Sequence, residues 1–291
     1  AVLCFASTID ARVSAAAAGA PPTTVPVNIQ KVSDYTLAKP CSNSSCLYYI
    51  NTTGATPYAP TAYENTPLLI NLNASSRMQI GYDYAALLAE ESSYTYATFL
   101  NSLTDGNTTI QNHIAIFSDY LWDHFYVKYV PAPFLDELKG MEQWCEDHPE
   151  QAAKLQYKPH LVSQRFMALA NMPADTPNLI AGLEREFENG WPSWLKVIVN
   201  DIIHYLVEHY VHTCDSYGVW GSRTQNGRLY TSRNLDYNSN TGINRYKLLQ
   251  VYNIQGANGK MQHQYVAFGF SFGLGALAGQ SSVGITTSEM N

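Results

Sequence analysis

The spacing of hydrophobic positions divides the 291-residue chain into an earlier part with mainly helical periodicity and a later part with strand alternation. Between residues 47 and 72, short apolar pieces alternate with Asn, Pro and Gly, which predicts short strands and turns. Helices are then predicted over residues 84–103, 109–129 and 134–145, with a further helix starting at "HPEQ". The strongest helical pattern covers residues 192–212, where apolar side chains recur at every third or fourth position.

After Cys214 the hydrophobic period changes to that of strands. Two alternating stretches lie on either side of Asn226-Gly227, a dipeptide that strongly favours a β-hairpin. Later strands are predicted over residues 246–254, 263–272 and 282–289. We therefore expect an α+β fold, in which a helix-rich part of roughly 210 residues leads into an antiparallel sheet.

Three segments follow from this pattern. Residues 1–40 are rich in Ala, Pro and Thr and are expected to be a signal-peptide remnant and a flexible N-terminus. Residues 41–213 form the mostly helical segment, and residues 214–291 begin the strand-rich segment.

Composition narrows the class of protein. Hydrophobic residues make up 46% of the chain and charged residues only 14%, which is typical of a globular protein. The net charge of −7 provides no basic surface, so no nucleic-acid partner is expected. No apolar run reaches the roughly 18 residues of a membrane-spanning helix, so no transmembrane segment is expected.

The N-terminal part predicts entry into the secretory route. The stretch "AVLCFASTIDARVSAAAAGAPP" has a short apolar run followed by small residues, like the end of a signal peptide whose first residues are missing. Four Asn-x-Ser/Thr acceptor triplets lie before Cys214, and none follows it. Their asparagines are Asn43, Asn51, Asn73 and Asn107. We therefore expect a secreted or lysosomal glycoprotein.

The cysteines are compatible with an oxidising compartment. Cys41 and Cys46 flank "SNSS" and can close a small disulfide loop. Cys4 is assigned to the signal remnant. Cys145 and Cys214 remain, and they either pair with each other or Cys145 pairs outside this sequence. If Cys214 stays free, Cys145 is left over.

Cys214 stands where the helical pattern ends and the strand pattern begins. A reactive cysteine needs thiolate character and a base. His212 is only two residues away, a spacing that does not hold a stable nucleophile–base pair. Cleavage of the chain before Cys214 would instead place a new α-amino group, with a pKa of about 7.7–8.0, on the nucleophile's own residue.

The residues from 214 to 237 also resemble a known family. The stretches "CDSYGVW" and "GRLYTSRNLDY" are similar to the start of the catalytic subunit in the N-terminal-nucleophile (Ntn) cysteine amidases. That family contains acid ceramidase, N-acylethanolamine acid amidase and acyl-CoA:6-aminopenicillanic-acid acyltransferase, and the likeness is closest to amoebal acid-ceramidase-like secreted proteins. Its members begin with Cys, turn at a glycine and return with Arg/Gln-Asn-hydrophobe-Asp, and "GITTSE" resembles a later strand of the family. The resemblance covers residues 205–291, and the earlier part matches only by position, as a helical α-subunit.

The resemblance implies specific roles. The chain would cut itself between Thr213 and Cys214, and Cys214 would be the acyl-accepting nucleophile. Arg233 matches the motif arginine near the thiol, and Asp236 matches the motif aspartate that holds the free amine. A nearby guanidinium lowers a thiol pKa, whereas a nearby carboxylate orients an ammonium group and raises its pKa. Asn234 falls on the opposite strand face, where we expect a structural role.

The same resemblance implies an αββα sandwich, no cofactor, and α and β fragments that remain associated after cleavage. Tyr217 and Trp220 are candidate walls of an acyl pocket, or alternatively core aromatics of a strand. The family's oxyanion-hole asparagine and a second arginine come later than residue 291. We therefore expect the β-subunit to be incomplete here, and this sequence alone not to be a competent enzyme, because losing one oxyanion donor costs about 10²–10³-fold in rate.

Simpler interpretations remain open. Cys214 can be a buried hydrophobe or half of a disulfide, and Arg233 and Asp236 can form a structural salt bridge. His204, Glu208 and His212 share one helical face, but they lack the His-Glu-x-x-His order, so we favour an amphipathic surface and expect no metal.

The sequence thus supports three functional hypotheses. The first is an amidase that hydrolyses or transfers the acyl group of an N-acyl amide, such as a ceramide-like or N-acyl-amine lipid. The second is an ester hydrolase of the phospholipase-B-like branch. The third is a non-catalytic secreted glycoprotein that keeps the fold.

Overall fold

A computed structural model describes residues 35–50, 67–170, 214–225, 227–235, 242–243, 245–256, 259–271 and 278–288. Within these ranges the chain forms helices and a mixed β-sheet, which confirms an α+β fold. The signal remnant, Asn51 and the helix predicted over residues 192–212 lie outside the described residues.

The larger sheet combines strands from before and after Cys214. Its seven strands are ordered β1-β2-β3-β6-β7-β8-β9. Their bounds are β1 (Tyr35–Leu37), β2 (Cys46–Ile50), β3 (Leu68–Ala74), β6 (Lys247–Gln255), β7 (Met261–Phe270), β8 (Ala278–Ser281) and β9 (Thr286–Ser288). β3 and β6 pair in parallel, and all other neighbours are antiparallel. The part before Cys214 therefore contributes three strands to a sheet that sequence analysis assigned to the later segment.

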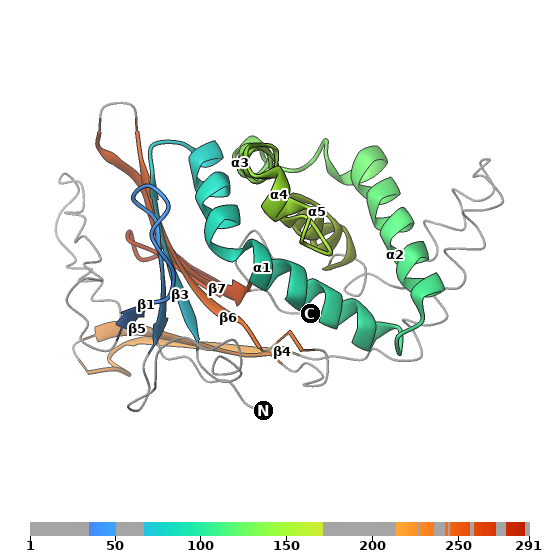
Figure 1. The fold of residues 1–291 in the computed structure, drawn as a ribbon. Helices are drawn as coiled ribbons and strands as arrows, with labels where there is room; N and C mark the ends of the chain where they lie inside the picture. Colours follow the sequence, from blue (N-terminus) through green and yellow to red (C-terminus); the bar gives the residue numbers. More distant parts are fainter. Residues whose placement is uncertain are drawn as a thin grey trace.

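The remaining strands form a separate two-stranded ribbon of β4 (Cys214–Gly221) and β5 (Gly227–Leu235). This confirms the predicted hairpin. Its last pair joins Gly221 to Gly227, so the loop is longer than the two-residue Asn226-Gly227 turn that we expected. Both closing glycines have positive φ angles, 62° and 66°, which glycine adopts without the steric cost of a side chain. In Figure 1 the ribbon lies at the bottom of the view, with its strands running across the direction of β3.

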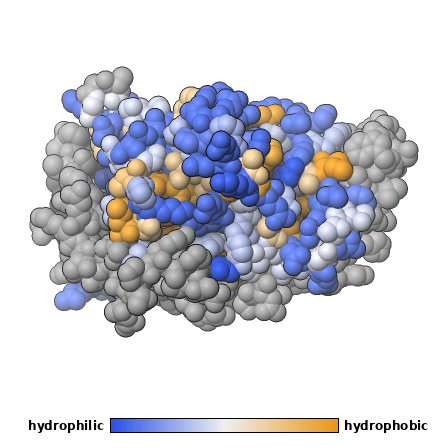
Figure 2. All heavy atoms as spheres, viewed as in Figure 1, coloured by the Kyte–Doolittle hydropathy of each residue, from blue (hydrophilic) through white to orange (hydrophobic). Residues whose placement is uncertain are grey.

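The helices gather on one side of the larger sheet (Figure 1). They are α1 (Arg77–Leu103), α2 (Thr108–Leu121), the single π-helical turn η2 (Trp122–Tyr126), α3 (Ala132–Asp147), α4 (Pro149–Ala152) and α5 (Pro159–Ala170). α2 and η2 replace the one helix that the sequence predicted over residues 109–129. In Figure 2 the surface over α3 is hydrophilic, and hydrophobic residues reach the surface in smaller areas below it.

The core lies between α1, α3 and the near face of the sheet. α1 contributes Ile80, Tyr84 and Leu88, all buried, and β3 contributes Ile70 and Leu72. Fully burying each of these large side chains stabilises the fold by about 1.5–3 kcal/mol. The strands after Cys214 complete the same core through Leu248, Tyr252, Ile254 and Ala267.

α1 begins seven residues before its predicted start at residue 84. Ser76 caps it, with its side chain accepting a hydrogen bond from the Gln79 backbone N–H at 3.1 Å. Ser-x-x-Gln is a recognised capping pattern, so the sequence did contain a signal for this start. Gly81 makes this helix start hard to recognise in the sequence, because a glycine in a helix is about 1 kcal/mol less favourable than an alanine.

Gly81 is required by the crossing of α1 and α3. A Cβ atom at Gly81 would lie 1.8 Å from the backbone oxygen of Glu137, and one at Gly140 would lie 1.9 Å from the backbone oxygen of Met78. The two helix backbones are therefore in direct contact at this crossing, and each helix supplies one glycine to it.

Candidate functional site

The β4–β5 ribbon places Cys214 close to Arg233. Cys214 is the first residue of β4 and pairs with Leu235, while Ser216 pairs with Arg233. Positions two apart on a strand share a face, so residues 214, 216, 233 and 235 all belong to one face of the ribbon. Residues 214 and 233 are diagonal neighbours on it, a relation that separates Cα atoms by roughly 7–8 Å.

The remaining motif residues are only partly placed. Asn234 pairs with Asp215, which puts both on the other face of the ribbon, as expected. Thr213 and Asp236 lie outside the described residues. The structure thus brings two of the three predicted catalytic positions together and leaves the position of the third undescribed.

Tyr217 and Trp220 lie on β4 with most of their surface exposed. Each side chain is 64% exposed, and neither is a core aromatic. The Trp220 ring and the Thr231 methyl group both lie near Gly218, because a Cβ atom built on Gly218 would be 3.7 Å from each of them. Both aromatics are therefore surface residues, but Tyr217 lies with Asp215 on the face of the ribbon opposite Cys214, so the two do not line one surface.

Cys145 does not share the environment that a reactive cysteine needs. It is a free, buried thiol on α3, and burial raises its pKa to about 11. Nearby Lys158 lowers this pKa only in part, and Glu142 and Glu146 raise it further. A thiol of this kind stays protonated and is inert as a nucleophile.

The disulfide between Cys41 and Cys46 is present, as predicted. Asp83, which is completely buried on α1, anchors the loop that this disulfide closes. Its carboxylate accepts hydrogen bonds from Ser42 and Asn43 at 2.9 and 2.7 Å on one oxygen and from Ser45 at 2.6 Å on the other. Gln79 of α1 adds a fourth, at 2.8 Å. The loop is thus fixed to the helical layer by hydrogen bonds as well as by its covalent closure.

Polar contacts also join β3, which precedes the predicted cut in the sequence, to β6, which follows it. The two strands pair over seven residues, from Leu68 opposite Leu248 to Ala74 opposite Ile254. Side-chain amides reinforce the ladder, since Asn253 donates to Asn71 at 2.8 Å and Gln255 donates to Asn73 at 3.2 Å.

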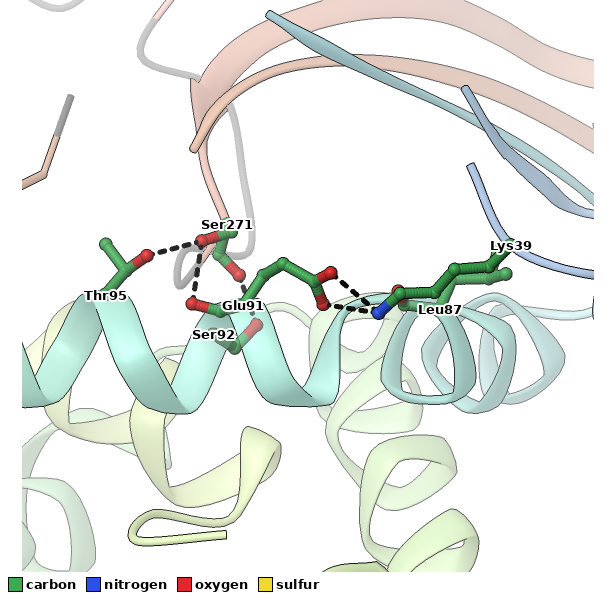
Figure 3. Close-up of polar contacts among 6 residues, drawn as sticks. All are labelled: Lys39, Leu87, Glu91, Ser92, Thr95 and Ser271. Atoms are coloured by element: carbon green, nitrogen blue, oxygen red, sulfur yellow. Dashed lines mark hydrogen bonds and ion pairs between the residues drawn. The ribbon is translucent and has the colours of Figure 1, made fainter. Parts of the chain in front are cut away.

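A second junction ties α1 to the residue that follows β7 (Figure 3). The buried backbone carbonyl of Ser271 accepts hydrogen bonds from the hydroxyls of Tyr84, at 2.7 Å, and Ser92. The Ser271 hydroxyl donates to the backbone carbonyl of Glu91 at 3.2 Å and lies 3.0 Å from the Thr95 hydroxyl. Beside it, the nearly buried Glu91 pairs with Lys39 at 2.6 Å. Losing one such buried partner costs about 1–3 kcal/mol, so the junction holds the end of β7 firmly against α1.

The described glycosylation asparagines differ in accessibility. Asn107 is exposed at the start of α2, where its side-chain oxygen caps the backbone N–H groups of Thr109 and Ile110. Asn43 is exposed, but its amide nitrogen contacts Asp83 and the Ser45 of its triplet is completely buried. Asn73 is half-buried within β3 and accepts from Gln255.

We therefore expect an N-linked glycan on Asn107 and none on Asn73, where a glycan would obstruct the pairing of β3 with β6. Glycopeptide mass spectrometry of protein from a secretory eukaryotic host measures both occupancies. T109A is the matched control, because it destroys the acceptor triplet and keeps the Asn107 cap. A glycan on Asn73 together with an empty Asn107 would contradict this assignment.

Other kinds of site find no support in the described part of the chain. There, no group of three or more His, Cys, Asp or Glu side chains is placed to hold a metal ion. His204, Glu208 and His212 lie outside the described residues. None of the described helices combines the length and the apolar character that crossing a bilayer requires.

Buried charged residues were missed by sequence analysis. Asp83, Glu91 and Glu137 are all buried, yet none was singled out. A signal was present for two of them. Glu91 continues the apolar spacing of Tyr84 and Leu87 on α1, and Glu137 precedes Met141 and Trp144 at the same spacing on α3. An acidic residue within an apolar stripe indicates a buried polar contact.

Comparison of this chain with family models, curated proteins and solved structures found no match in any of the three.

Proposed function

We propose that this protein is a cysteine amidase of the Ntn class, cut between Thr213 and Cys214 to expose its nucleophile. The observation that carries the proposal is the register of the β4–β5 ribbon. In this register Arg233 is the diagonal neighbour of Cys214 on one face of the ribbon, and Cys214 is the first residue of β4. The proposal includes the αββα sandwich of that class, of which the seven-stranded sheet with helices on one face would form two layers.

The proposed cut and the proposed turnover use the same thiol. In the cut, the Cys214 sulfur attacks the carbonyl carbon of Thr213 and the peptide C–N bond breaks. Water then hydrolyses the resulting thioester, leaving a Thr213 carboxylate and a free α-amino group on Cys214. In turnover, the thiolate attacks the acyl carbon of an N-acyl amide, and the amine leaves with a proton from the α-ammonium group. Water releases the carboxylic acid from the second thioester.

Two further residues support this chemistry. A guanidinium at Arg233 would lower the pKa of the Cys214 thiol and increase the thiolate fraction. A carboxylate at Asp236 would hold the new ammonium group in place. Trp220, which is exposed, would contribute apolar surface to an acyl site and be available for contact with a lipid substrate, whereas Tyr217 lies on the face of the ribbon opposite Cys214.

The cut fragments are proposed to stay together. The β3–β6 ladder and the Ser271 junction both join residues before Cys214 to residues after it without a covalent link. Both contacts are made by residues distant from the cut in the sequence, so cleavage would break neither. A secreted or lysosomal location is proposed with this function, and the Cys41–Cys46 disulfide is compatible with it.

An activity assay tests the proposed substrate class. With the full natural protein after acid incubation, we expect release of fatty acid from N-acyl amines and ceramide-like amides, and at least a 10²-fold loss of that release in C214A. Mass spectrometry of the released acid measures it. C145A is the matched control and should retain activity, since that thiol is buried and protonated.

The alternatives predict other results in the same assay. Release of fatty acid from phospholipid esters without amide turnover would favour a phospholipase-B-like hydrolase. Binding of acyl amides with no release above background in either wild-type protein or C214A would favour a non-catalytic glycoprotein, and equal turnover by the two proteins would show that Cys214 is not the nucleophile; either result would contradict the proposal.

A further inference from the structure

Glu137 is a completely buried carboxylate at the crossing of α1 and α3. One of its oxygens pairs with the Arg77 guanidinium at 2.6 Å. The other oxygen, Oε2, has no hydrogen-bond partner among the described residues. Burying half of an ionised carboxylate without a partner is costly, because its hydration is lost and only the Arg77 contact compensates.

The carboxylate has little freedom to reach water. The backbone of Glu137 is in contact with α1 at Gly81, so α3 is held at closest approach where this side chain begins. Among the described residues, four titratable side chains interact with it. They are Arg77 and Tyr84 on α1, Tyr252 on β6 and Tyr265 on β7. Arg77 is the cation of this set, and burial and the nearby carboxylate both raise the pKa values of the three tyrosines, which therefore remain neutral.

Arg77 connects Glu137 to the sheet. The guanidinium nitrogen that pairs with Glu137 also donates to the Tyr265 hydroxyl at 3.0 Å, and the guanidinium carbon lies 5.9 Å from the centre of the Tyr265 ring. Tyr265 stacks on Tyr252 with ring centres 4.4 Å apart. The charge state of one side chain on α3 therefore acts on contacts that join two helices to two strands.

Burial raises the pKa of Glu137 from 4.5 to about 7, although Arg77 lowers it in part. In the unfolded chain the pKa returns to its ordinary value, so the folded state holds the proton more tightly. The resulting stabilisation is fully present below about pH 4.5 and is lost as the pH rises towards 7.

We propose that Glu137 makes the packing of α1 and α3 on the sheet pH-dependent, by keeping a proton in the folded protein at mildly acidic pH that the unfolded chain releases. In the neutral form the unpartnered oxygen no longer carries buried charge, and the other oxygen still accepts from Arg77. The packing of α1 and α3 on the sheet is then most stable in an acidic compartment and becomes less stable at neutral pH. This inference concerns stability, and it stands or fails independently of the amidase proposal.

Urea unfolding of the full protein at pH 4.5, 6.0 and 7.5 tests the inference. We expect the ratio of folded to unfolded wild-type protein to fall by roughly 100-fold between the extremes, relative to E137Q, whose amide does not titrate. E150Q is the matched control, because Glu150 is an exposed glutamate on α4, and it should follow the wild-type profile. Parallel pH profiles for wild-type protein and E137Q would overturn the inference.

A measurement on wild-type protein decides the matter if E137Q fails to fold. Infrared difference spectra of protein labelled with 13C-glutamate distinguish a protonated carboxyl from a carboxylate. A buried, protonated glutamate band that persists at pH 6 is the expected result. Carboxylate bands alone at pH 6 would overturn the inference.

Discussion

We expect the C214A variant of the full natural protein to remain a single uncut chain under acidic conditions, and the wild-type protein to separate into two fragments on a denaturing gel. The reason is chemical: alanine offers no sulfur to attack the Thr213 carbonyl, and uncatalysed peptide hydrolysis is negligible on this time scale. The expected effect is complete loss of cleavage. The cut should also proceed at the same rate at all protein concentrations, because the attacking thiol belongs to the same chain.

Two variants distinguish self-cleavage from digestion by a contaminating protease. C214S should cut slowly, since a hydroxyl is a weaker nucleophile than a thiolate, and C145A should cut at the wild-type rate. A protease would cut C214A as readily as the wild-type protein or would show a rate that changes on dilution, and either result would contradict self-cleavage.

We expect the G81A variant to lose about 3 kcal/mol or more of folding free energy, although alanine is the better helix former. A Cβ atom at Gly81 would come within 1.8, 2.5 and 2.7 Å of three backbone atoms of Glu137, and backbone atoms cannot rotate away. α1 and α3 must therefore separate, which disrupts the core between them. Urea unfolding at a fixed acidic pH measures the loss.

G218A provides the comparison. A Cβ atom at Gly218 would meet its nearest neighbours at 3.7 Å, which is ordinary van der Waals contact. We expect a change of less than about 1 kcal/mol there, because a strand tolerates alanine. Equal stabilities for G81A and G218A would contradict the close helix crossing.

Local patterns predicted the local structure well. The apolar spacing identified most of α1 and α3, the two hairpins, and strands β6, β7 and β9, because each depends on neighbours along the chain. The disulfide between Cys41 and Cys46 was predictable for the same reason, since four residues between cysteines leave few other ways to close.

Contacts between distant segments were not predictable in this way. The parallel pairing of β3 with β6 joins one strand that precedes the helices in the sequence to one that follows them. The hydrophobic alternation within each strand does not specify its partner. The buried pair of Glu137 with Arg77 and the Ser271 junction depend on that pairing and on the helix crossing. For the candidate site, the sequence predicted a hairpin that returns Arg233 towards Cys214, because a hairpin is itself local. The expected two-residue turn at Asn226-Gly227 would give another register, and the longer loop that closes at Gly221 and Gly227 is what makes residues 214 and 233 diagonal neighbours.

N-terminal sequencing of the separated fragments of the full natural protein is the most direct test of the proposed nucleophile. We expect a fragment that begins Cys-Asp-Ser-Tyr, with the free α-amino group on Cys214. A fully active protein in which Cys214 remains joined to Thr213, or whose only new N-terminus lies elsewhere, would contradict it.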